Sequence, residues 1–60
     1  MKKYNVTFEI FMEDGRKEQK TVTIEAGNKK YAAVRAMMEI NKDKAVAQLF
    51  KNLIGIREVA

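Results

Sequence analysis

The sequence contains no histidine, cysteine, serine, tryptophan or proline in its 60 residues. Without histidine the chain lacks the side chain that most often acts as a general base near neutral pH, and without cysteine or serine it lacks the commonest nucleophiles. The absence of cysteine also excludes disulfide bonds and the cysteine-based zinc sites. We therefore expect no enzyme activity, no metal site and no cofactor.

The eight carboxylates do not change this expectation. Glu9, Glu13 and Glu25 are predicted on a solvated sheet face or turn, and Glu39 and Asp43 near helix ends. None lies within an apolar run of the kind that tunes a carboxylate for acid–base catalysis. The threonines are typical strand residues, and nothing in the sequence supplies a base to activate them.

The composition, 47% hydrophobic and 33% charged, is that of a globular chain. Residues 1–60 are too few for more than one small domain, so burial or association must supply the stability. The basic start of the chain is followed by an alternating pattern rather than an apolar run, which predicts neither a signal peptide nor a membrane span. We expect a cytoplasmic protein.

A β-hairpin is predicted at the start of the chain. Apolar residues occupy every second position from Tyr4 to Met12, and Val22 and Ile24 repeat the alternation. A three-residue loop, Glu13–Gly15, with Gly15 in the left-handed region, keeps the apolar residues of both strands on one face. This register pairs Val6 with Val22, Tyr4 with Ile24, Lys3 with Glu25 and Thr7 with Thr21.

Two helices are predicted to follow the hairpin. Asn28 is a good N-cap for a helix over residues 29–41, and Asp43 for a shorter one. In the second helix, apolar residues recur at helical spacing, at Val46, Leu49, Phe50, Leu53 and Ile54. Gly55 is placed to end this helix. Residues 56–59 could close the domain as a short third strand. The expected fold class is therefore α+β, although the sequence leaves open whether residues 43–54 are helix or part of a longer strand.

The expected core combines the apolar face of the hairpin with apolar residues of both helices. Its members are Tyr4, Val6, Phe8, Ile10, Val22, Ile24, Val34, Met37, Met38, Leu49, Phe50 and Leu53. The first helix has a wider apolar arc than one sheet face can cover. One flank is therefore a candidate protein interface, formed by Tyr31, Val34, Met37 and Met38, and methionine is adaptable at such surfaces. The small size of the chain favours a homodimer.

Basic residues give a second hypothesis, since the net charge is +4. Lys29 and Lys30 occupy the first turn of the predicted helix, where free backbone N–H groups favour anions. Together with the basic residues of the hairpin they are candidate phosphate contacts for a small nucleic-acid-binding protein; the set is Arg16, Lys17, Lys20, Lys29 and Lys30. Only Phe11 is expected on the open sheet face, too few aromatics for a single-stranded RNA platform.

The run Lys20-Thr21-Val22-Thr23-Ile24-Glu25-Ala26, with the polar cap and alanine-rich helix after it, carries a resemblance in layout. It is similar to the small β-hairpin-plus-helix proteins encoded by bacteriophages and prophages, and the likeness covers roughly residues 4–40. Several such proteins bind a host enzyme, a defence nuclease complex or a transcription component. The resemblance implies a binding role, as a modulator of a host protein, and assigns no functional residues. In the simplest members a strand follows the first helix directly.

Overall fold

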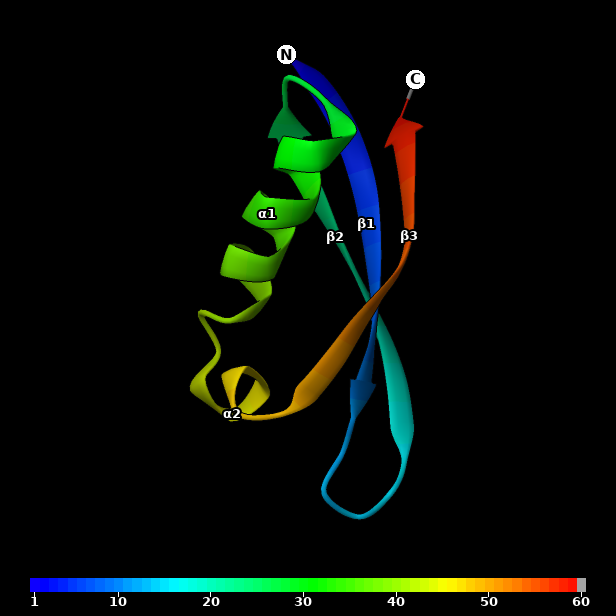
Figure 1. Cartoon of the computed structure of the whole chain (residues 1–60), viewed down its shortest axis with the longest axis vertical. Coiled ribbons are helices and arrows are strands. Elements are labelled where there is room, and N and C mark those ends of the chain that lie inside the picture. Colours follow the sequence, from blue (N-terminus) through cyan, green and yellow to red (C-terminus); the bar gives the residue numbers. More distant parts are fainter. Residues whose placement is uncertain (60) are drawn as a thin grey trace.

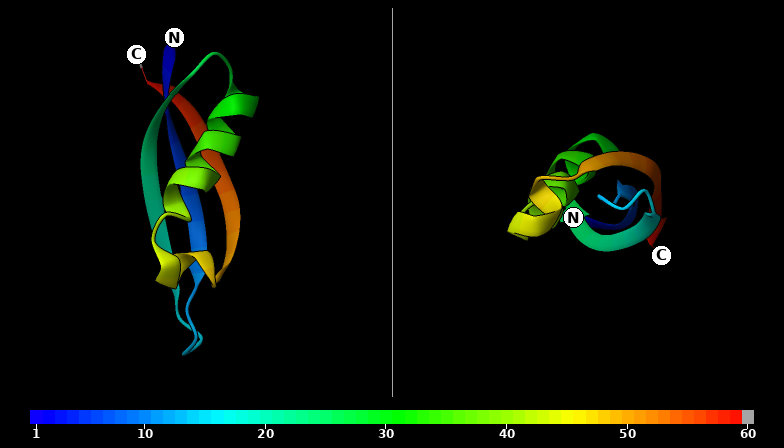
Figure 2. Two further views of the ribbon diagram at one scale, coloured as in Figure 1. Left: turned by 90° about the vertical axis from the view of Figure 1, so that its left-hand side faces the viewer. Right: turned by 90° about the horizontal axis from the view of Figure 1, so that it is seen from below.

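The computed structural model describes residues 1–59, which form a small α+β fold (Figure 1). Three antiparallel strands, β1 (Lys2–Phe11), β2 (Lys17–Ala26) and β3 (Phe50–Val59), pair in the order β2-β1-β3. Helix α1 (Lys29–Ile40) and the single turn α2 (Lys44–Ala47) connect β2 to β3. Seen end-on in Figure 2, the strands curve and both helices lie together on one side of the sheet.

The hairpin has the register that the sequence predicts. Val6 pairs with Val22, and Thr7 pairs with Thr21 through a hydroxyl–hydroxyl hydrogen bond of 2.9 Å. Met12 closes the loop, because its N–H donates to the Arg16 carbonyl at 2.8 Å and its own carbonyl accepts from Gly15. Gly15 has a φ of 91°, a conformation that glycine adopts without strain. The three-residue loop is confirmed.

Both predicted caps are also confirmed. The Asn28 side chain accepts the Tyr31 N–H at 3.0 Å, and the Asp43 side chain accepts the Ala45 N–H at 3.0 Å. These bonds satisfy backbone donors that the first turn of a helix leaves without partners. Helix α1 ends at Ile40, one residue before the predicted end, and α2 stops after four residues.

The predicted second helix is wrong beyond Ala47. Residues 50–59 form a full ten-residue strand that pairs with β1 along its length, from Phe11 opposite Phe50 to Lys3 opposite Val59. The third strand is therefore longer than the four residues predicted. Gly55, expected to end a helix, lies opposite Thr7 instead.

The core is centred on β1, whose inward side chains are almost completely buried. Helix α1 covers them with small residues: Ala32 and Ala36 are fully buried, and Ile40 completes the same face one turn later. Because large side chains from β1 fill much of the space between the layers, small side chains at Ala32 and Ala36 let the helix pack closely above them. The buried residues are Tyr4, Val6, Phe8, Ile10, Ala26, Ala32, Ala36 and Ile40.

Four residues predicted to be in the core are exposed: Val34, Met38, Phe50 and Leu53. The first two lie on the outer side of α1, because the alanine face turns toward the sheet. The other two belong to β3, the strand that was predicted as helix. Val22, Ile24, Met37 and Leu49 are partly buried against the core, as expected of residues at its margin.

Candidate functional site

The outer surface of α1 carries three large apolar side chains in a row. Tyr31, Val34 and Met38 are spaced by three and four residues, so they project from one side of the helix, and they are 63%, 54% and 66% exposed. We call these three residues the α1 ridge. Met37, the fourth member of the predicted interface, turns toward the core and is only partly exposed.

An apolar groove of about 400 Å³ runs between α1 and β3. Its lining is apolar except for one asparagine and consists of Ala33, Val34, Met37, Met38, Asn41 and Leu53. Leu53 contributes to this groove because β3 lies at the edge of the sheet, beyond the area that α1 covers. The groove therefore joins the α1 ridge to the exposed side of β3.

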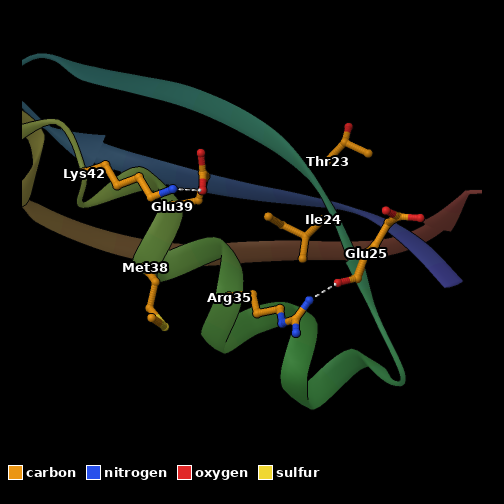
Figure 3. A pocket seen from close by; sticks show the side chains of 7 residues that line it. All are labelled: Thr23, Ile24, Glu25, Arg35, Met38, Glu39 and Lys42. Atoms are coloured by element: carbon orange, nitrogen blue, oxygen red, sulfur yellow. Dashed lines mark hydrogen bonds and ion pairs between the residues drawn. The ribbon is translucent and has the colours of Figure 1, made fainter. Parts of the chain in front are cut away.

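A polar cleft of about 520 Å³ lies on the other side of α1, next to β2 (Figure 3). The Arg35 guanidinium donates to the Glu25 carbonyl at 2.9 Å, and Lys42 pairs with Glu39 at 3.0 Å. Figure 3 shows Arg35 reaching toward β2 while Met38 points away from it. Because two acidic and two basic side chains line the cleft, it has no net charge to attract an ionic ligand. Met38 borders both the cleft and the apolar groove.

Within residues 1–59, no group of three or more histidine, cysteine, aspartate or glutamate side chains lies close enough to hold a metal ion. The hydroxyls of Thr7 and Thr21 bond to each other, and that of Thr23 donates to the Asn5 side chain at 2.8 Å. In the same part of the chain, neither helix has the length and hydropathy needed to span a membrane.

The five candidate phosphate contacts divide between two ends of the molecule. The hairpin tip and the start of α1 lie at opposite ends of the long axis, along which the molecule measures 38 Å (Figure 1). At the tip, Arg16 pairs with Asp14 at 2.6 Å, and the Lys17 ammonium lies 5.4 Å from the centre of the Phe11 ring. Lys20 lies on β2 opposite Phe8. Lys17 lies with Phe11 on the open face of the sheet and Lys20 on the opposite face, so the structure gathers neither the three hairpin residues nor Lys29 and Lys30 into one cluster.

Sequence reasoning missed the contribution of β3 to the molecular surface. Phe50 lies beside Phe11 on the open face of the sheet, with ring centres 5.3 Å apart, so Phe11 is not the lone aromatic expected there. Leu53 and Ile54 are also exposed, at 40% and 48%. The sequence left open that residues 43–54 belong to a longer strand. Following that alternative would have placed Phe50, Leu53 and Ile54 on a strand at the surface.

Comparison with protein-family models, with curated proteins and with solved structures finds no match to this chain.

Proposed function

We propose that this protein is a non-catalytic protein-binding module whose partner docks on the α1 ridge and the apolar groove beside it. The single observation that carries the proposal is the ridge itself, three large apolar side chains that are each more than half exposed. Large, contiguous apolar surface that a folded chain leaves in contact with water is typical of an interaction site. Tyrosine and methionine also suit such surfaces, because they offer large contact area and adaptable shape.

The groove supports a partner that inserts apolar side chains rather than charged ones. Its lining offers almost no polar group to pair with a charge, and a buried unpaired charge would weaken binding. An amphipathic segment that lays one apolar face between α1 and β3 fits this surface. The resemblance in layout that the sequence has to small phage-encoded proteins would make a host protein the target. Self-association of the module is part of the same proposal.

The test is a pull-down of the tagged protein from bacterial lysate, with half of the sample treated with nuclease. We expect the intact chain to recover a discrete protein that survives nuclease, and the Met38→Asp variant to lose it, because a carboxylate would be desolvated at the ridge. Met38 is 66% exposed, so the variant should remain folded; circular dichroism checks this.

A matched control is the double variant Lys29→Glu, Lys30→Glu at the start of α1. It changes four units of charge but leaves the ridge intact, so partner recovery should persist. If recovery instead collapses with nuclease and with this double variant, the protein binds nucleic acid through phosphate contacts, and the proposal is wrong.

A further inference from the structure

Strand β3 leaves one edge of the sheet open, and the middle of that strand carries no charge. The run from Asn52 to Ile56 is Asn-Leu-Ile-Gly-Ile, and Leu53 and Ile54 are exposed within it. An exposed strand edge presents unpaired N–H and C=O groups and pairs readily with another strand. The partner we consider is a second copy of the chain.

A β-bulge divides β3 into two halves. Thr7 pairs with Gly55 and the next residue of β1, Phe8, pairs with Leu53, so Ile54 is the extra residue. Before the bulge the residues that face α1 are Lys51 and Leu53, which pair with Ile10 and Phe8. After it they are Ile56 and Glu58. The inward positions are therefore odd-numbered in one half and even-numbered in the other.

This change of parity restricts how β3 can pair with itself. In an antiparallel homodimer, inward residues of one strand must lie opposite inward residues of the other, or apolar side chains would face the wrong side. Matching odd positions with even ones places the two-fold axis between residues rather than on one. The two bulges then lie opposite each other. In each strand, Ile54 and Gly55 lie between Leu53 and Ile56, and these last two residues pair with Ile56 and Leu53 of the other copy.

We propose that two copies associate by antiparallel pairing of their β3 strands, with the two-fold axis between Ile54 and Gly55. The proposal deepens the self-association included in the proposed function and identifies its surface. Across the axis the register pairs Phe50 with Val59, Lys51 with Glu58, Asn52 with Arg57, Leu53 with Ile56 and Ile54 with Gly55 of the second copy.

These pairs are complementary in chemistry. Leu53 and Ile56 meet on the side of α1, and Phe50 and Val59 meet on the open face, so apolar residues lie opposite apolar residues on both sides. The Lys51 ammonium is held by backbone carbonyls of its own chain and Glu58 pairs with Lys2, so the apolar pairs, and not attraction between these two charges, favour this register. A shift by two residues in one direction places Ile56 opposite Lys51, and in the other direction places Leu53 opposite Glu58. Of these three registers, only the unshifted one places no apolar side chain opposite Lys51 or Glu58.

The absence of cysteine from the sequence allows a direct test. Asn52→Cys and Arg57→Cys each add one thiol at an exposed position of β3, and the proposed register places these two positions opposite each other. We expect an oxidised mixture of the two variants to give a covalent dimer at least tenfold faster than either variant alone. In each single variant the like thiols are five residues out of register, too far apart for a disulfide.

The control is Gln19→Cys, an exposed position on β2, mixed with Arg57→Cys. Equal crosslinking in this mixture would overturn the proposal, as would sedimentation of the unmodified chain as a monomer at high protein concentration. Crosslinking should persist in chains that also carry Met38→Asp, because the α1 ridge lies off the strand edge. If partner recovery depends on Met38 but no register-specific crosslink forms, the dimer is wrong while the binding role stands.

Discussion

The two outer strands of the sheet have the same length and pair with the same central strand, yet their open edges differ. β2 carries charge at Lys17, Glu18, Lys20 and Glu25, and two of these, Glu18 and Lys20, lie on the side of the sheet that bears the core. Inward-pointing charges of this kind discourage a strand from pairing with another chain. β3 also has two of them, Lys51 and Glu58, but they lie next to its ends. β3 has no charge from Asn52 to Ile56 and exposes apolar side chains there instead. The comparison indicates that the edge of β2 is protected against association and that the edge of β3 is available for it.

The largest expected effect comes from placing a charge on the available edge. Ile54→Lys should weaken the dimer by at least about 2 kcal/mol, because two ammonium groups would approach each other near the two-fold axis and apolar contact would be lost. Gln19→Lys adds the same charge to the edge of β2 and should leave association nearly unchanged. Sedimentation equilibrium of both variants measures the difference, and an equal response would remove the distinction between the edges.

A smaller effect separates two lysines at comparable positions on the outer strands. The Lys51 ammonium on β3 donates to the Val46 and Leu49 carbonyls, both at 2.9 Å, and thereby fastens α2 to the strand. We expect Lys51→Met to lower the free energy of unfolding by about 1–2 kcal/mol, since it removes charged hydrogen bonds but keeps the apolar stem. Lys20→Met on β2 should change it by less than about 0.5 kcal/mol, because Lys20 is exposed. Urea denaturation gives both values, and equal losses would contradict the anchoring role.

The smallest effect concerns Gly55, which occupies on β3 the position that Thr21 occupies on β2, since both lie opposite Thr7. A Cβ atom at Gly55 would meet no other heavy atom within 4 Å. Gly55→Thr should therefore raise the free energy of unfolding by about 0.5–1 kcal/mol, by restricting the unfolded chain and suiting a strand. Gly15→Thr should instead lower it by about 1–2 kcal/mol, because φ there is 91°. Thermal unfolding distinguishes the two; destabilisation by Gly55→Thr would show that the bulge requires glycine.

The hairpin was predictable because two local signals agree. The alternation from Tyr4 to Met12 fixes which face is buried, and only an odd number of loop residues keeps Val22 and Ile24 on the same face. The caps at Asn28 and Asp43 were predictable for a similar reason, since each depends on one side chain and the N–H groups that follow it. Register and helix starts therefore followed from residues close together in the sequence.

Strand β3 was not predictable in the same way, because its bulge hides the alternation. Inward residues change from odd to even numbers at Ile54, and the resulting spacing of Phe50, Leu53 and Ile54 is equally that of a helix face. Whether a bulge forms depends on pairing with distant residues of β1, since Phe8 pairs with Leu53 and Thr7 with Gly55. The exposed flank of α1 was anticipated from its wide apolar arc, but Leu53 beside it could not be, since it depends on where β3 lies.

The position of β1 between its two partners has a consequence for the order of folding. The hairpin closes a loop of three residues, whereas Phe11 and Phe50 meet only after 38 intervening residues have been brought together. Closing the longer loop costs more entropy, and contacts distant in sequence form slowly. We therefore expect β3 to dock last, onto a hairpin and helix that have already met. Until it does, one edge of the central strand is open to other chains, so the interval before docking is when this protein is most prone to aggregate.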